Sequence, residues 1–158
     1  MTLQDRLDFA RTTALEAGKL AQDLRRNPDR LDIAEKGHQD FVTAADLAVE
    51  TLIRKRIKDK YGDEAVLGEE TGLQGDSPHL WILDPIDGTT NFMHGLPDWA
   101  ISIAYCHAGD IKMGVLFAPD LDILAEGCSE IVGSAKVNDA AISVSSQHGA
   151  TRALISVG

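Results

Sequence analysis

Cysteine, positive charge and long apolar runs are all scarce in this sequence of 158 residues. The two cysteines, Cys106 and Cys128, match neither a zinc-binding spacing nor a disulfide framework, so we expect buried, reduced thiols in a cytoplasmic protein. Only 15 Lys and Arg stand against 25 Asp and Glu, and the net charge of −10 disfavours nucleic acid and anionic membranes as partners. No apolar run is long enough to cross a bilayer, and charged residues interrupt the N-terminal positions where a secretory signal would lie.

Hydrophobic residues make up 44% of the chain, which is enough for one domain with a core. Apolar positions recur every three or four residues over residues 3–24, which predicts a helix capped by Thr2. A second helix is predicted to begin at Thr43 and Asp46, where a hydroxyl and a carboxylate occupy the cap and third positions. Leu47 is expected on its buried side.

Short apolar runs separated by turn residues follow the helices and are typical of strands. They span residues 65–68, 81–83, 99–107, 111–118 and 123–126, with a last pair around residues 137–140. Residues 71–79, rich in Gly, Ser and Pro, are predicted to be a loop. This order predicts an α+β fold in which two N-terminal helices pack on a mostly antiparallel sheet.

Residues 81–92, WILDPIDGTTNF, concentrate the chemistry of the chain. The first three are apolar and read as a short strand covered on both faces. Pro85 cannot pair in a ladder and restricts the residue before it, so Asp84 is expected at the end of this strand. Asp87 comes three positions later, and Gly88 then lets backbone N–H groups approach an anion.

Two carboxylates placed together in this way need a partner. At a separation of about 4 Å they repel by roughly 4 kcal/mol at an effective dielectric constant near 20, so the pair takes up a proton or a cation. Hard oxygen ligands beside a phosphate-sized anion nest favour Mg²⁺. The bare D-P-x-D-G pattern is explained equally well by a pair of turns in which Asp and Gly serve only the backbone.

The whole string changes that balance, because it resembles the signature W-I-x-D-P-x-D-G-T-x-N-F of the inositol monophosphatase family. These are Mg²⁺-dependent, lithium-sensitive sugar and inositol phosphatases, and every fixed position of their signature is present here. Such a long match in fixed register is far more specific than a lone glycine motif. The resemblance implies the first half of a layered αβαβα phosphatase fold, a Mg²⁺ cofactor and a homodimer.

The resemblance also implies roles for individual residues. The implied metal ligands are Glu69, Asp84, the backbone carbonyl of Ile86, and Asp87. The implied catalytic residues are Asp46, Glu69 and Thr89, with Asp46 and Thr89 activating water. The implied substrate contacts are Lys36, Glu69, Ile86, Asp87, Gly88 and Thr89. On the residues alone, Asp46 could equally cap its helix and Glu69 could be ordinary surface charge.

We therefore predict Mg²⁺-dependent hydrolysis of a small phosphate monoester, with inositol 1-phosphate favoured by the residues after D-G-T. The alternatives are a fructose-1,6-bisphosphatase, an NADP or nucleotide phosphatase, or a non-catalytic binding or regulatory protein that retains the fold. A W-D-x-A-A-G motif, which carries a further metal ligand in the family, is absent. Residues 1–150 are thus expected to form an N-terminal metal-binding domain, and residues 151–158 to begin a second α/β half that this chain lacks.

Overall fold

A computed structural model of the chain describes residues 1–27 and 38–146, without the side chains of residues 38–43. The helices are α1 (Leu3–Arg26), α2 (His38–Tyr61) and α3 (Thr89–Met93). The strands are β1 (Ala65–Gly68), β2 (Gly72–Gln74), β3 (His79–Asp87), β4 (Ala100–His107), β5 (Asp110–Ala118), β6 (Ile123–Cys128), β7 (Lys136–Val137) and β8 (Ala140–Ala141).

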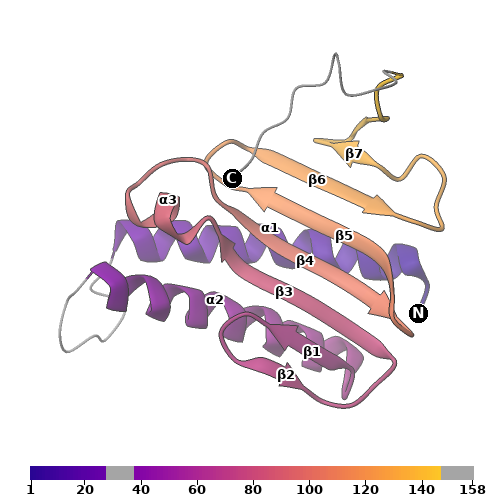
Figure 1. Ribbon diagram of the computed structural model, residues 1–158, viewed down its shortest axis with the longest axis horizontal. Helices are drawn as coiled ribbons and strands as arrows, with labels where there is room; N and C mark the ends of the chain where they lie inside the picture. Colours follow the sequence, from indigo (N-terminus) through magenta and orange to yellow (C-terminus); the bar gives the residue numbers. More distant parts are fainter. Residues whose placement is uncertain (28–37, 147–158) are drawn as a thin grey trace.

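The strands form one sheet in the order β2-β1-β3-β4-β5-β6-β7-β8. Strands β1 and β3 run parallel and the other neighbouring pairs run antiparallel. Helices α1 and α2 lie side by side on one face of the sheet (Figure 1). The predicted α+β fold is confirmed, while the loop predicted over residues 71–79 contains the edge strand β2, whose pairing partner is the neighbouring strand β1.

Helix α1 begins and packs as its sequence predicts. Thr2 accepts a hydrogen bond from the backbone N–H of Asp5, and the Asp5 carboxylate accepts one from the backbone N–H of Thr2. Such a capping box is worth about 0.5–2 kcal/mol. A stripe of small buried residues then faces the sheet, and a Cβ on Gly18 would lie 2.7 Å from the ring of Phe117 on β5. The small side chains therefore let the helix approach the sheet closely.

Helix α2 begins earlier than predicted. Its first residue is His38, so Thr43 and Asp46 lie inside the helix and the capping interpretation of Asp46 is wrong. The chain between residues 38 and 46 contains no Pro or Gly that would stop a helix from continuing upstream. Asp46 is only 2% exposed, whereas Leu47, which we expected to be buried, is 45% exposed.

Strand β3 carries the WILDPID segment and is longer than predicted. Trp81 and Leu83 are buried in the core under the helices, while the intervening Ile82 is half-buried on the other face. This alternation corrects the expectation of a strand covered on both faces. Regular pairing with β4 extends to Asp84 and resumes at Asp87 after a register shift. The proline lies in this interruption, because it has no N–H to give to the ladder.

A buried ion pair joins α1 to the residue before β1. Arg6 donates to both carboxylate oxygens of Glu64 at 2.7 and 2.6 Å, and Trp81 Nε1 donates to the same carboxylate at 2.9 Å. The Arg6 guanidinium also lies 4.2 Å from the ring centre of Tyr105 and 4.6 Å from that of Tyr61. Burial opposes ionisation of Glu64, but the hydrogen bonds from Arg6 and Trp81 outweigh it and lower the pKa of Glu64.

The thiols and helices agree with what the composition predicts. Cys106 and Cys128 are free and buried. Over the described ranges 1–27 and 38–146, none of the helices combines the length and apolar character that a membrane span requires.

Candidate active site

Carboxylates gather where the pairing between β1 and β3 ends. The two strands are parallel, with Gly68 paired to Leu83. The residues that follow this pair, Glu69 after β1 and Asp84 within β3, therefore lie side by side. Glu70 comes next in the chain, and both glutamates are exposed. The parallel register thus brings together two acids that stand fifteen positions apart in the sequence.

Asp84 lies at the centre of this group. Burial raises its pKa to about 7, aided by the charge of Glu69, a hydrogen bond shared with Glu69, and the charge of Asp87. Its Oδ1 atom is buried and has no hydrogen-bond partner. A buried carboxylate oxygen without a partner is costly, which marks Asp84 as a residue retained for a purpose other than stability.

Asp46 approaches the same group from α2. It is 2% exposed, and its Oδ1 atom is also buried without a hydrogen-bond partner. Burial, together with the nearby charges of Glu70, Glu69 and Asp84, raises the pKa of Asp46 to about 8. The structure therefore brings the predicted residues Asp46, Glu69 and Asp84 together from three different elements.

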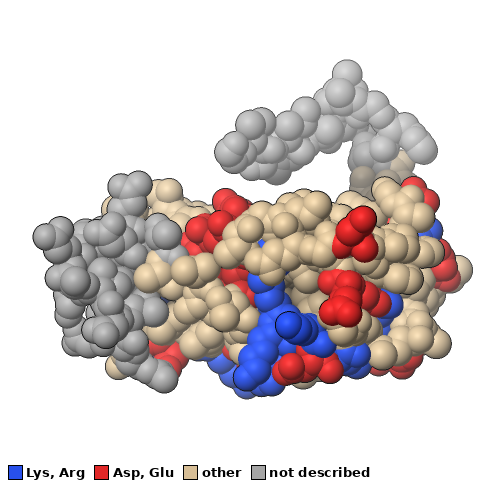
Figure 2. All heavy atoms as spheres, turned by 90° about the horizontal axis from the view of Figure 1, so that it is seen from below, with Lys and Arg blue, Asp and Glu red and all other residues tan. Residues whose placement is uncertain are grey.

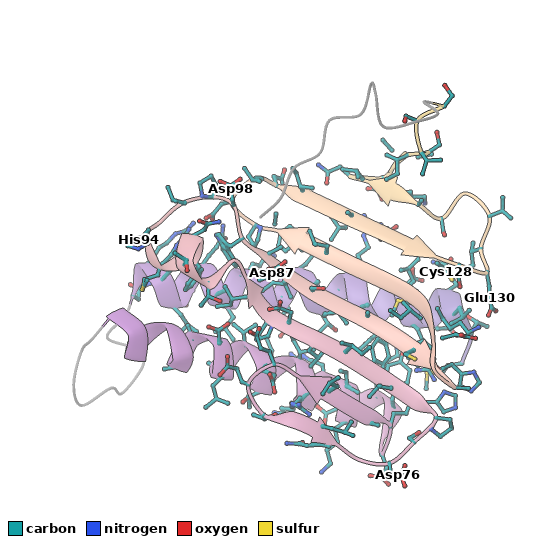
Figure 3. The ribbon with its side chains drawn as sticks, viewed as in Figure 1. Asp76, Asp87, His94, Asp98, Cys128 and Glu130 are labelled. Atoms are coloured by element: carbon teal, nitrogen blue, oxygen red, sulfur yellow. The ribbon has the colours of Figure 1, made fainter. Side chains whose placement is uncertain are left out.

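Asp87, Gly88 and Thr89 lie at the end of β3 and the start of α3. Asp87 is exposed, and Figure 3 shows it at the α3 end of the sheet. Gly88 has φ +87°, and a Cβ there would lie 2.7 Å from the backbone oxygen of Asp98, so both conformation and space require glycine. Thr89 Oγ1 donates to the backbone oxygen of Ile86 at 3.1 Å rather than to Asp46. The expected Asp46–Thr89 pair is thus not hydrogen-bonded here.

The donors suit a divalent cation in kind. Asp84 offers a buried oxygen without a partner. The carboxylate of Glu69 is a neighbour of Asp84, and Ile86 adds a backbone carbonyl oxygen. Oxygen ligands of this type are those that Mg²⁺ prefers. Within the described part of the chain, however, no three His, Cys, Asp or Glu side chains are gathered at ligand spacing. Glu69 and Asp87 are exposed side chains that can change rotamer, so the ligand set remains a prediction that this chemistry supports.

Two predicted features fall partly or wholly outside the described residues. Lys36, the predicted phosphate contact, lies in the undescribed segment 28–37. Thr43, the predicted cap residue, lies in α2, but its side chain is not described.

Glu50 is a site residue that sequence reasoning missed. It is fully buried one helical turn after Asp46, and its carboxylate accepts hydrogen bonds from Arg54, Thr71 and the backbone N–H of Glu70. Burial opposes its ionisation, but these hydrogen bonds together lower the pKa of Glu50. The available signal was an acidic residue on the apolar face of α2, four positions before an arginine.

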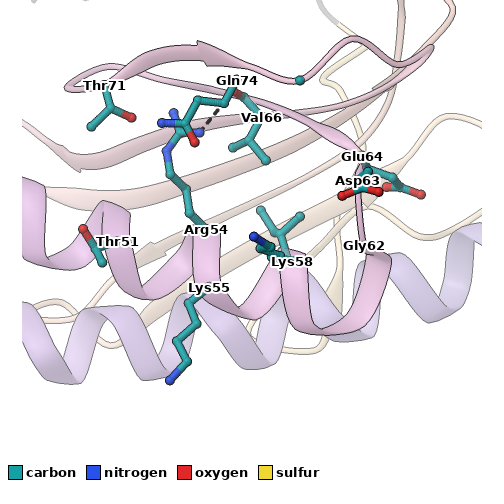
Figure 4. A pocket seen from close by; sticks show the side chains of 12 residues that line it. Thr51, Arg54, Lys55, Lys58, Gly62, Asp63, Glu64, Val66, Thr71 and Gln74 are labelled. Atoms are coloured by element: carbon teal, nitrogen blue, oxygen red, sulfur yellow. Dashed lines mark hydrogen bonds between the residues drawn. The ribbon is translucent and has the colours of Figure 1, made fainter.

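A pocket of about 540 Å³ lies between α2 and the β1–β2 hairpin rather than over the carboxylates. Arg54 crosses it from the helix to the strands (Figure 4), and Lys55 and Lys58 also line it. Figure 2 shows basic side chains gathered along this edge of the molecule, with acidic ones to either side. Because Arg54 is already bonded to Glu50, this basic group contains less uncompensated charge than the surface view suggests.

Solved structures with a similar fold include inositol monophosphatases. The inositol monophosphatase from Anabaena (Nostoc) sp. PCC 7120 superposes with a TM-score of 0.78 and 33% identity, over 93% of this chain and 52% of that one. The chain itself belongs to the inositol monophosphatase family, whose model matches residues 2–158. The resemblance seen in the WILDPIDGTTNF string is confirmed. Family members are generally metal-dependent, and the oxygen donors at Asp84 and Ile86 are of the kind that a divalent cation takes.

Curated relatives carry more than one name. A Thermotoga maritima protein named fructose-1,6-bisphosphatase/inositol-1-monophosphatase is 42% identical over 120 residues, which is 75% of this chain and 45% of the relative. The Pseudomonas aeruginosa protein named Nus factor SuhB is 38% identical over 124 residues, which is 74% of this chain and 45% of the relative. The chain thus spans a little under half the length of these relatives.

Proposed function

We propose that the protein hydrolyses a small phosphate monoester with the help of Mg²⁺, and that inositol 1-phosphate is its preferred substrate. The observation that carries the proposal is the pair of buried carboxylate oxygens without partners, on Asp46 and Asp84, in a chain of this family. Folding alone gives no reason to bury them unsatisfied. A catalytic site that requires negative charge gives one.

The residues proposed to hold the cation are Glu69, Asp84, the carbonyl of Ile86, and Asp87. A divalent cation bound there supplies charge neutralisation and increases the acidity of water for attack on phosphorus. Asp46, whose Oδ1 atom has no hydrogen-bond partner, is proposed to accept the proton of the attacking water. The Thr89 hydroxyl, oriented by its bond to Ile86, is proposed to position that water.

The phosphate is proposed to contact the backbone N–H groups at Gly88 and Thr89, because the positive φ of Gly88 suits a backbone anion nest. Lys36 is proposed to add a positive charge near the phosphate. Glu69, Ile86 and Asp87 remain the other proposed contacts, through the shared cation.

Fructose 1,6-bisphosphate is the second candidate substrate, because a relative with 42% identity carries both activities in its name. NADP or a nucleotide phosphate, and a non-catalytic binding or regulatory role, stay as further alternatives. The name Nus factor SuhB, carried by some relatives, suggests a macromolecular partner for those proteins. The net charge of −10 does not favour binding of nucleic acid here, and we propose no such partner. Lithium sensitivity, a homodimer and a cytoplasmic location complete the proposal, the location being consistent with two free thiols.

The test is phosphate release from myo-inositol 1-phosphate, fructose 1,6-bisphosphate and a 3′-phosphonucleotide, with and without Mg²⁺. It is run on this chain and on any longer native form. The variant Asp87→Asn should lose at least about 100-fold in turnover while keeping its thermal midpoint, because it removes one charge from a repulsive group. Asp76→Asn, an exposed acid at the opposite end of the sheet, is the matched control (Figure 3).

Turnover confined to the longer form would place the remaining ligand and the specificity in sequence beyond this chain. Equal activity of Asp87→Asn and Asp76→Asn would remove Asp87 from the site. Mg²⁺ binding without turnover of any ester by either form would replace the enzyme with the binding-protein alternative.

A further inference from the structure

Glu50, one helical turn after Asp46 on α2, has a carboxylate that is fully buried and accepts three hydrogen bonds. Its exposed fraction is 0%. It accepts from Arg54 Nε at 2.7 Å, from Thr71 Oγ1 at 2.5 Å, and from the backbone N–H of Glu70 at 2.9 Å. Two of these three donors belong to the turn that follows β1, about twenty positions further along the chain.

The turn is shaped around this carboxylate. A Cβ on Gly68 would lie 2.3 Å from the carboxylate carbon of Glu50 and 2.4 Å from each of its oxygens. Any side chain at this position would therefore displace Glu50. The last residue of β1 is glycine because the carboxylate of α2 occupies the space that its side chain would take.

Arg54 extends the same contact to both sides of the turn. Besides its bond to Glu50, it donates to the backbone oxygen of Val66 on β1 at 3.2 Å and to that of Gly72 on β2 at 2.7 Å. Figure 4 shows its side chain reaching from α2 to the strands. The Glu50–Arg54 pair thus binds the segment before the turn, the turn itself and the segment after it.

A purely stabilising role explains this arrangement poorly. A buried ion pair is generally no more stabilising than apolar residues of similar volume, because both charges must be removed from water. What the pair does supply is a fixed backbone geometry for the residues that it bonds. Between Gly68 and Glu70 stands Glu69, the residue that the parallel register of β1 and β3 brings beside Asp84.

We propose that Glu50 is a positioning residue that fixes the turn after β1, and through it the carboxylate of Glu69, for cation binding at Asp84. The proposal deepens the proposed function and rests on it for the identity of the site. Glu50 itself touches neither substrate nor cation. It acts through the amide of Glu70 and the hydroxyl of Thr71.

The test compares Glu50→Gln with Glu16→Gln in the intact 158-residue chain and in any longer native form. Glu16 is the matched control, because it too is an ion-pair partner of an arginine, Arg56, but at an exposed position. Two quantities are measured: Mg²⁺ affinity by calorimetry, and amide hydrogen exchange at Glu70 without metal. We expect Glu50→Gln to weaken Mg²⁺ binding about 10- to 100-fold and to accelerate exchange at Glu70, while Glu16→Gln changes neither.

A second variant guards against a failure of Glu50→Gln to fold. Thr71→Val removes one donor without altering any charge, and it should produce a smaller change of the same sign in both quantities. Unchanged exchange at Glu70 in a folded Glu50→Gln protein, or in Thr71→Val if the former does not fold, would overturn the proposal. If Glu50→Gln shows accelerated exchange and weaker Mg²⁺ binding but the wild-type protein releases no phosphate, the positioning role stands and the phosphatase function is rejected.

Discussion

Two carboxylates near α2, the partly buried Glu64 and the buried Asp46, differ in how the fold treats their charge. Glu64 accepts two hydrogen bonds from Arg6 and one from Trp81, and its pKa is lowered. Asp46 has a buried oxygen without any partner, and its pKa is raised to about 8 by burial and by neighbouring acids. The Glu64 end of the sheet is arranged to make a buried charge stable. Around Asp46, carboxylate oxygens of Asp46 and Asp84 are buried without hydrogen-bond partners. This is expected where a bound ligand supplies the missing partner.

The largest expected effect comes from breaking the ion pair between Arg6 and Glu64. Arg6→Met leaves Glu64 buried without its partner, so we expect a loss of about 3–5 kcal/mol in the free energy of unfolding, measured with urea. The control is Arg56→Met, which breaks the exposed pair with Glu16 and should cost no more than about 1 kcal/mol. Similar losses in the two variants would contradict the difference between a buried and an exposed pair.

A smaller effect on stability is expected from adding a side chain at Gly88, in the candidate site. Gly88→Ala places a methyl group 2.7 Å from the Asp98 carbonyl oxygen, whereas Gly109→Ala, at the almost equal φ of +90°, meets no atom within 4 Å. Both variants bear the same backbone strain, and the clash should make Gly88→Ala about 1–3 kcal/mol less stable than Gly109→Ala. Thermal unfolding measures the difference. Equal midpoints would mean that the backbone at Asp98 gives way without cost.

Local patterns made most of the fold predictable. The spacing of apolar residues that indicates α1, and the short apolar run between turns that indicates β1, are local features of the sequence. Both elements occur where the sequence predicts them. Strand β2 was missed because three residues carry little pattern of their own and form a strand only by pairing with β1. The start of α2 was missed because a capping pattern near Asp46 also fits the interior of a helix.

The candidate site divides in the same way. Asp84, Asp87 and Gly88 could be identified because their signature is contiguous in the sequence. The contact between Glu69 and Asp84 depends on the parallel register of two strands, which no local pattern specifies. Glu50 depends on donors about twenty positions away, and without them its only sign is an acid on an apolar helix face.

The smallest expected effect sharpens the comparison at Asp46 itself. Its folded-state pKa of about 8 lies above the ordinary 3.8, so folding favours the protonated carboxyl. The resulting stability is fully present below about pH 4 and is lost as the pH rises to about 8. Asp46→Asn keeps the position neutral at every pH, so without metal it should be more stable than the wild type by about 1 kcal/mol at pH 8. Thermal midpoints in a chelator at pH 5 and pH 8 test this. An advantage that does not grow with pH would show that Asp46 has a partner in solution, and that the two ends of the sheet treat their charges alike.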